Sequence, residues 1–225
     1  MLPLNPAPAL TRLAAMLLFA SGAVAYARSS GQDAHRSPWD AEAGSSEPDD
    51  PGRDAWQKPA AVMRALAPAR DAVVADIGAG NGYFSVRLAR ALPRGQVVAV
   101  DTDPQLVRCL SRRAQREGLS NLSAQPGGAE EPKLARKVDL ALLVDTYRCI
   151  RHRERYFRSV RAALRPGGRL AIIDFRLDAP LGPPLRARVL AQTVIAELTQ
   201  AGFELRRQYH FLPYQHFLLL AAASR

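Results

Sequence analysis

Residues 73–89 read VVADIGAGNGYFSVRLA, and the rest of the chain can be interpreted from this segment. A short apolar run at residues 73–77 meets a glycine cluster at residues 78–82, after which Phe84, Leu88 and Leu92 recur at four-residue spacing. The pattern predicts a strand, a tight loop and a helix. Alternate glycines permit positive φ angles and leave the main chain bare, while the start of the helix offers free N–H groups. The stretch therefore predicts a cradle for a nucleotide-like ligand.

The rest of the chain repeats the alternation of strand and helix. Apolar runs predict further strands at residues 97–100, 122–125, 138–144, 170–173, 203–209 and 217–222. Alternation of this kind favours βαβ crossovers, and the short connection before the last strand favours an antiparallel pair at the edge. We therefore predict an α/β fold, with a Rossmann-like, doubly wound seven-stranded sheet that is mostly parallel, has an antiparallel last strand and carries helices on both faces.

Carboxylates stand at one edge of this predicted sheet. Asp76, Asp101, Asp145 and Asp174 fall at or near the carboxyl ends of four strands. In open α/β sheets ligands bind beyond these ends. The sequence therefore places the site at the carboxyl edge.

The first 54 residues have a different composition. Residues 1–27 carry one charge, at Arg12, an apolar run at residues 13–24 and a small-x-small site that ends at Ala27. This is typical of a signal peptide, and of an N-terminal anchor where no cleavage occurs. Residues 28–54 are rich in Ser, Gly, Asp, Glu and Pro and predict a disordered linker. The globular domain is expected at residues 55–225, with Trp56 as either a lid over the site or a plug at the core edge.

Composition limits the function classes. The 225 residues suit one domain with an extension, and 48% hydrophobic residues suffice for a core. The net charge of +10 permits an anionic partner, but all the cationic residues except Lys58, Lys133 and Lys137 are arginines, a bias that coding composition can also produce. The two cysteines, Cys109 and Cys149, show no metal-ligand spacing, so no metal site is predicted.

Three motifs in order point to a family. Residues 76–82, DIGAGNG, resemble the glycine-rich first motif of the class I S-adenosylmethionine-dependent methyltransferases, of the small-molecule type that includes the quinone-biosynthesis enzymes. Asp101 matches the acidic residue that holds the ribose hydroxyls in that family. Residues 164–170, LRPGGRL, resemble the family's Leu-Lys-Pro-Gly-Gly turn before the fifth strand. The resemblance covers residues 56–222 and implies S-adenosyl-L-methionine as the cofactor.

The resemblance also implies roles for single residues. The glycines of the loop would wrap the methionine part of the cofactor, Asp101 with Thr102 would bind the ribose, and Asp145 would line the floor near the sulfonium. Gly128, Ala129 and Glu130 are the alternatives for the adenine. The full cofactor-binding set that the resemblance implies is Asp76, Gly78, Ala79, Gly80, Asn81, Gly82, Tyr83, Asp101, Thr102, Gly128, Ala129, Glu130 and Asp145.

Catalytic residues are harder to assign from the sequence. Methyl transfer from a sulfonium is an in-line displacement, so orientation and exclusion of water can supply most of the catalysis. Where the acceptor needs a base, the candidates are Asp145, Tyr147 and His152. Related sequences often carry histidines at the positions of Arg148 and Cys149, so a reduced or changed activity is an alternative.

We expect a methyltransferase that acts on a small or lipid-like acceptor. The alternatives are a nucleic-acid methyltransferase, which the basic composition suggests but which lacks interleaved aromatic residues, and a cofactor-binding module with little turnover. The leader predicts export to the periplasm or a tether to the inner membrane through residues 1–27, with a cytoplasmic location as the alternative. Nothing in the sequence indicates the oligomeric state.

Overall fold

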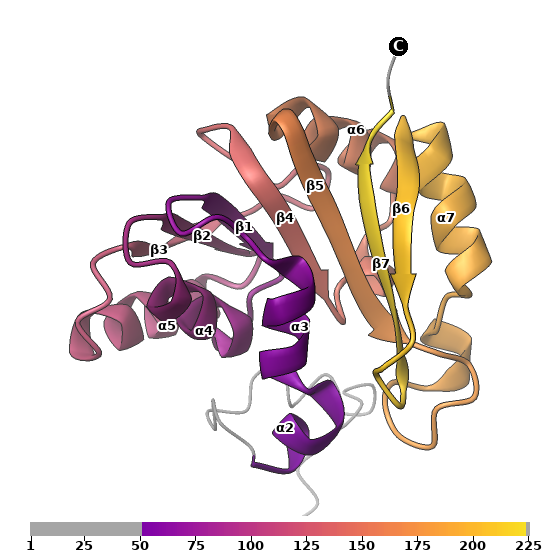
Figure 1. The fold of residues 1–225 in the computed structure, drawn as a ribbon, viewed down its shortest axis with the longest axis horizontal. Coiled ribbons are helices and arrows are strands. Elements are labelled where there is room, and N and C mark those ends of the chain that lie inside the picture. Colours follow the sequence, from indigo (N-terminus) through magenta and orange to yellow (C-terminus); the bar gives the residue numbers. More distant parts are fainter. Residues whose placement is uncertain (1–50, 224–225) are drawn as a thin grey trace, which may run out of the picture. The chain divides into compact units, whose positions relative to one another are not determined.

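The computed structural model describes residues 51–223 (Figure 1), so the predicted leader and most of the predicted linker lie outside the described residues. Within this part the strands form one seven-stranded sheet in the spatial order β3-β2-β1-β4-β5-β7-β6. The strands are β1 (Val73–Ile77), β2 (Gln96–Asp101), β3 (Leu122–Pro126), β4 (Val138–Val144), β5 (Leu164–Phe175), β6 (Phe203–Tyr209) and β7 (Gln215–Ala222).

The sheet confirms the predicted fold class. β1 to β5 pair in parallel, with Val74 opposite Val97 on one side and opposite Leu140 on the other. β7 runs antiparallel to β5 and to β6 and lies between them. β6 is therefore one of the two edge strands, and β7 begins at the carboxyl edge beside the end of β5.

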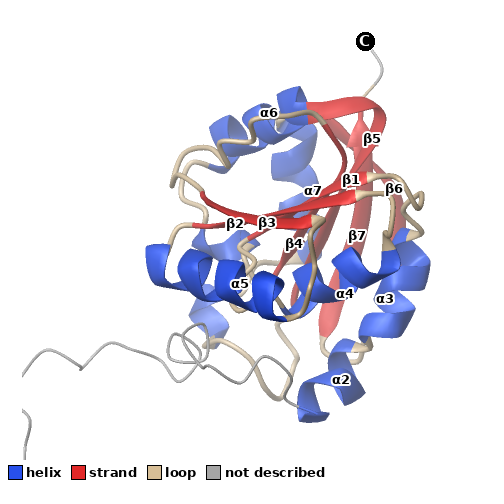
Figure 2. Ribbon diagram, turned by 90° about the vertical axis from the view of Figure 1, so that its left-hand side faces the viewer, coloured by secondary structure: helices blue, strands red, loops and turns tan. Residues whose placement is uncertain are grey.

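Helices cover both faces of the sheet (Figure 2). They are α2 (Pro51–Gln57), α3 (Pro59–Leu66), α4 (Tyr83–Ala91), α5 (Pro104–Arg116), α6 (Arg153–Ala163) and α7 (Ala191–Gln200), with short 3-10 helices η1 (Tyr147–Cys149) and η2 (Leu185–Ala187). Buried residues of α3, α4 and α5 pack on one face, and those of α6 and α7 pack on the other. None of the helices in residues 51–223 is long and apolar enough to cross a membrane.

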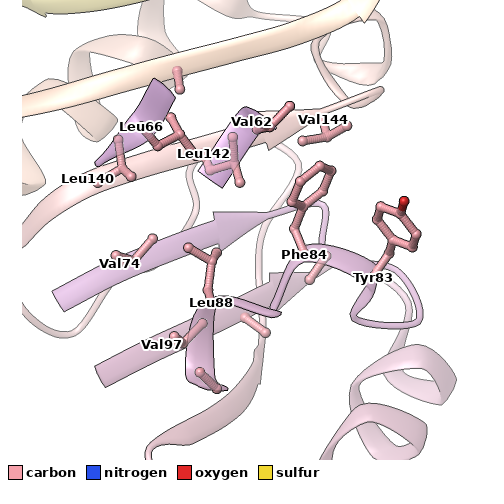
Figure 3. Close-up of a cluster of buried hydrophobic side chains, with 14 of the residues drawn as sticks. Val62, Leu66, Val74, Tyr83, Phe84, Leu88, Val97, Leu140, Leu142 and Val144 are labelled. Carbon is pink, nitrogen blue, oxygen red and sulfur yellow. The ribbon is translucent and has the colours of Figure 1, made fainter. Parts of the chain in front are cut away.

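Two hydrophobic clusters form the core, one on each face. Val74, Leu140 and Leu142 point into the first cluster, where Figure 3 shows them near Leu88 and Phe84. Their sequence neighbours on β1 and β4 point into the second cluster, against α6 and α7. Because both faces are covered, the central strands read as continuous apolar runs. Truncation of one fully buried leucine to alanine would cost about 2–5 kcal/mol.

The structure differs from the sequence prediction in two places. Residues 51–54, which composition assigned to the linker, form the start of α2, because the side chains of Arg53 and Asp54 find tertiary partners that composition does not show. The predicted turn at Pro166–Gly168 lies within β5. There the register with β4 shifts between Val138 and Leu140, and Gly167 has a φ angle of 78°. The Pro-Gly-Gly segment is therefore a bulge in a longer strand.

Candidate active site

The glycine loop at residues 78–82 joins β1 to α4. Gly78, Gly80 and Gly82 all have positive φ angles, of 75°, 56° and 87°. A Cβ atom on Gly78 would lie 2.2 Å from the Thr146 hydroxyl, and one on Gly82 would lie 2.3 Å from a Leu110 methyl group, whereas one on Gly80 would meet nothing within 4 Å. Gly78 and Gly82 are thus required for packing. Gly80 presents bare main chain to open space.

Asp101, at the end of β2, is tied to this loop. One carboxylate oxygen accepts the Gly80 N–H at 2.8 Å, and the other accepts the Asp103 N–H at 3.0 Å. The N–H groups of Gly78 and Ala79 both donate to the Val100 carbonyl. The loop and the carboxylate are therefore fixed side by side, with the exposed Thr102 next in the chain.

Asp76 lies beneath the loop, where its side chain is buried. It accepts a 2.5 Å hydrogen bond from the Ser85 hydroxyl, which ties the end of β1 to the first turn of α4. Burial raises the pKa of Asp76 to about 6, against the opposing effect of the Ser85 hydrogen bond. Asp76 therefore supports the loop from within.

Tyr83 begins α4 and is clamped by charged side chains. The guanidinium groups of Arg53 and Arg87 each lie 4.0 Å from the centre of its ring, and its hydroxyl donates to Asp54. Arg87 also pairs with Asp54 at 3.1 Å. Burial and the Asp54 hydrogen bond raise the pKa of the phenol, so it is not a base at neutral pH. The contacts instead hold α2 against the loop, at the Tyr83 end of the cluster in Figure 3.

Asp145 directly follows β4 and has a strained backbone, with a φ angle of 56°. Its N–H donates to the Ile173 carbonyl, and the Gln215 amide donates to its carboxylate at 2.6 Å. Arg53 lies 3.7 Å from the second carboxylate oxygen, and a fifth of the Asp145 side chain, 21%, is exposed. The site therefore holds a carboxylate that several elements position and that solvent can still reach.

The protonation of Asp145 follows from these surroundings. Its pKa is raised to about 7, first by burial and second by the neighbouring Asp174 carboxyl, while Arg53, Arg148 and Gln215 act in the opposite direction. Asp174 lies near the carboxyl end of β5, and burial raises its pKa too. Asp145 can therefore gain or lose a proton near neutral pH.

Helix α2 contacts the end of β5 and the start of β7 at this carboxyl edge. The Gln57 amide donates to the Gln215 side-chain oxygen at 2.7 Å, and Arg53 donates to Gln57 at 2.9 Å. The ring of Trp56 lies 5.5 Å from that of Phe175 and 6.2 Å from that of Tyr214. Trp56 thus packs over the ends of β5 and β7, as a cover for this edge of the sheet.

A cavity opens beyond β3. It has a volume of about 310 Å³ and is lined by Gly128, Ala129, Glu130, Glu131, Lys133 and Arg155. The Gly127 N–H donates to the Asp101 carbonyl at 2.8 Å, so this segment continues from the carboxylate beside the loop. The three residues predicted for the adenine all line the cavity; their role stays a prediction.

A family match accompanies this geometry. Residues 69–209 match the family described as "Methyltransferase domain", which is more than half of the chain. The chain belongs to this methyltransferase family. Its matched part contains the loop, Asp101, the cavity and Asp145, and excludes α2 and β7.

Individual relatives agree with the methyltransferase assignment. The chain is 35% identical over 101 residues to malonyl-[acyl-carrier protein] O-methyltransferase of Methylococcus capsulatus, a match that covers 44% of this chain and 36% of that protein. It is 29% identical over 126 residues to the ubiquinone/menaquinone biosynthesis C-methyltransferase UbiE of Syntrophotalea carbinolica, covering 56% and 52%. The matched part of this chain thus corresponds to about half of the length of these relatives or less.

A solved structure shows the same fold. A SAM dependent methyltransferase from Aquifex aeolicus superposes with a TM-score of 0.74 at 21% identity, covering 80% of this chain and 96% of that chain. At this identity the likeness speaks to the fold alone. The cofactor and the acceptor must be argued from the site itself.

The methyltransferase site gathers most, but not all, of the residues predicted from the sequence. The glycine loop, Tyr83, Asp101 and Asp145 are linked by the contacts described above, and the Asn81 carbonyl accepts from Arg113 at 3.2 Å. Tyr147 is different: its ring is buried in the second cluster, stacked on Phe157, and its hydroxyl donates to Glu197 at 2.5 Å. The 3-10 helix η1 turns the side chain of Tyr147 inward, to a core position, and its catalytic role stays a prediction.

His152 lies at the start of α6, where it is exposed and its side chain makes no capping hydrogen bond; its catalytic role stays a prediction. Sequence reasoning missed Arg53, Gln57 and Gln215. A sequence signal existed only for Gln215, which together with His216 forms the polar start of an otherwise apolar strand.

Proposed function

We propose that this chain transfers a methyl group from S-adenosylmethionine to a small or lipid-like acceptor. One observation carries the proposal: the bare main chain at Gly80 lies directly beside a fixed carboxylate, Asp101. A nucleoside with a sulfonium-bearing chain needs both features, a close approach to backbone and an acceptor for its ribose hydroxyls. The family match supports this proposal.

The residues present fit this cofactor. The open face at Gly80 would receive the methionine part, Asp101 would hold the ribose, and the cavity at Gly128–Glu130 would take the adenine. The bound cofactor would supply an activated methyl group. The protein's part is to align the acceptor with that group and to exclude water, for which α2 with Trp56 covers the carboxyl edge.

Asp145 is the group best placed to accept a proton from an acidic acceptor. It is partly exposed, its pKa lies near 7, and Gln215 and Arg53 hold its two oxygens. A phenol, a hydroxyl or an activated carbon would need this step, whereas an amine would not. The acceptor class therefore decides whether Asp145 is used.

The contacts do not favour the nucleic-acid alternative. Several arginines of the basic helices are paired within the domain: Arg155 with Glu130 at 2.9 Å, Arg158 with Glu154 at 2.6 Å and Arg113 with Glu117 at 2.7 Å. Such pairs reduce the positive charge available to phosphates.

Calorimetric titration with S-adenosylmethionine tests the proposal. Asp101→Asn should weaken binding about 10- to 100-fold, because a charged acceptor for the ribose is lost. Asp103→Asn is the matched control: it is a nearby exposed carboxylate that caps α5, and its loss should leave affinity unchanged. The absence of binding by the unaltered protein, or equal affinities of the two variants, would refute the assignment.

The acceptor can then be sought with cofactor that carries a labelled methyl group. Label should enter the organic-extractable or small-molecule fraction of a cell extract and should not enter its RNA. Label found in RNA would establish the nucleic-acid alternative instead. Cofactor binding without any transfer would point to a module without turnover.

The location also remains a proposal. We propose that residues 1–27 hold the domain at the inner membrane, since an apolar run follows Arg12 and the cofactor is made in the cytoplasm. Fractionation combined with N-terminal sequencing tests this. A soluble protein cleaved after Ala27 would contradict the tether.

A further inference from the structure

The connection between β5 and α7, residues 176–190, exposes apolar side chains. Among the described residues, the large hydrophobic side chains with the greatest exposure are Leu185 at 62%, Leu190 at 50%, Leu177 at 39% and Leu205 at 38%. Three of these four lie in this one connection, which we call the leucine loop. Leu205 lies apart from it, on β6. Exposed apolar surface is thus concentrated on the leucine loop.

The leucine loop is built around one guanidinium. Arg188 donates hydrogen bonds of 2.7 to 3.2 Å to the carbonyls of five residues of the loop: Arg176, Leu177, Ala179, Leu181 and Pro183. Gly182, with a φ angle of 110°, packs so closely on Phe175 that a Cβ atom would lie 2.5 Å from that ring. The loop is therefore compact, and its leucines are held outward by its own structure.

This arrangement suits an apolar environment. Moving a main-chain carbonyl out of water costs free energy when the carbonyl gains no new hydrogen-bond donor, and this cost normally keeps loops out of membranes. Here Arg188 already satisfies five carbonyls from inside. The leucine loop can therefore enter the boundary between lipid headgroups and acyl chains with little loss of hydrogen bonding.

The charged residues of the leucine loop indicate which kind of surface it would bind. It contains three arginines and one aspartate, and the aspartate, Asp178, is already paired with Arg176 at 3.0 Å. Arg186 is exposed and lies next to Leu185, the most exposed of the leucines. A leucine beside an exposed arginine matches an acyl chain beside an anionic headgroup.

A protein partner fits these residues less well. Residues 176–190 contain no aromatic side chain, whereas the centres of protein interfaces are enriched in tyrosine, tryptophan and phenylalanine. We propose that the leucine loop docks the domain on an anionic lipid bilayer, with Leu185 at the acyl boundary and Arg186 on the headgroup phosphates.

The docking would also orient the site. The leucine loop follows directly on β5 (Figure 1). The end of this strand carries Asp174 and Phe175, and the ring of Phe175 lies 5.5 Å from that of Trp56 of α2. The carboxyl edge of the sheet would then face the bilayer, which would suit a lipid-like acceptor. Docking itself does not rest on methyl transfer, so a domain without turnover would bind in the same way.

A site-specific fluorophore tests the proposal on the full chain. In a protein with Cys109→Ser and Cys149→Ser, which removes both native thiols, Leu185→Cys is labelled with an environment-sensitive dye. Leu205→Cys with the same dye is the matched control, because Leu205 is an exposed leucine outside the loop. Vesicles of phosphatidylcholine with phosphatidylglycerol should raise the emission intensity of the dye at position 185 several-fold and shift its emission to the blue. The emission of the dye at position 205 should not change.

Charge and lipid composition give a second readout. Arg186→Glu in the labelled protein should weaken the vesicle-dependent signal about tenfold, and pure phosphatidylcholine or high salt should weaken it comparably. Sedimentation of the protein with vesicles while the dye at position 185 does not respond would overturn the proposal, because another part of the chain would then bind. A signal at position 185 that depends on protein concentration without vesicles would overturn it too, in favour of a protein interface.

Discussion

Substitution of Gly78 by alanine separates packing from ligand binding in the glycine loop. The new Cβ atom would lie 2.2 Å from the Thr146 hydroxyl and 2.4 Å from its methyl group, and Gly78 has a φ angle of 75°. An alanine at positive φ costs about 1–2 kcal/mol. The collision with Thr146 adds about 1–3 kcal/mol as overpacking. The free energy of unfolding should therefore fall by about 2–5 kcal/mol.

Thermal unfolding measures this loss. For a domain of this size each kcal/mol lowers Tm by about 2–4 °C, so Gly78→Ala should lower it by about 4–20 °C. Gly80→Ala is the control, since its φ angle of 56° carries the backbone cost but its Cβ atom meets nothing within 4 Å. Its Tm should fall by less, about 2–8 °C.

The affinity for S-adenosylmethionine should rank the two alanine variants in the opposite order to Tm. The methyl group of Gly80→Ala projects from the open face of the loop, so S-adenosylmethionine affinity should fall at least about tenfold, and by more than in Gly78→Ala. Thr146→Gly combined with Gly78→Ala should restore part of the lost Tm, since the colliding atoms are gone. Equal Tm values for the two alanine variants, or no recovery in the double variant, would refute the packing argument.

Three further perturbations follow from the site. The pKa of Asp76 is raised to about 6 from an unfolded value near 4, so the native state holds a proton that the unfolded state releases, and the free energy of unfolding should fall by about 3 kcal/mol as pH rises from 4 to 7. Urea titrations at several pH values should show that Asp76→Asn flattens this dependence. With an acidic acceptor, activity should rise as pH passes about 7, and Asp145→Asn should abolish this limb; an unchanged pH–rate profile in the variant would exclude Asp145 as the base. Gln57→Leu leaves the buried Gln215 oxygen without its donor, so the free energy of unfolding should fall by about 1–3 kcal/mol and proteolysis within α2 should accelerate. The control Ala55→Ser, on the exposed side of α2, should change neither quantity.

The sheet could be predicted from the sequence because its signals are local. Runs such as residues 97–100 and 138–144 are continuous and apolar, which requires cover on both faces. The insertion of β7 between β5 and β6 has no such local signal. It depends on the register of Phe217 with Ile173, a contact between residues far apart in the chain.

The site could be predicted only where backbone conformation constrains the residue type. Gly78 and Gly82 must be glycine because Thr146 and Leu110 occupy the space of a side chain, and that constraint is visible as a motif. Arg53 and Gln57 carry no comparable signal, since they act through side-chain contacts with Asp145 and Gln215 that form only after folding. The burial of Tyr147 could not be predicted for the same reason: the 3-10 turn that directs its side chain inward is not encoded by a periodic pattern.

The position of β7 also bears on synthesis of the protein. β6 leaves the ribosome before β7, yet β7 lies between β6 and the rest of the sheet, so β6 has no strand to join until residues 215–222 have emerged. Until then the edge of β5 is unpaired and can pair with other chains. The same late segment brings Gln215 to Asp145. An unfinished chain therefore lacks both a closed sheet and a complete site, and it cannot be active before it is folded.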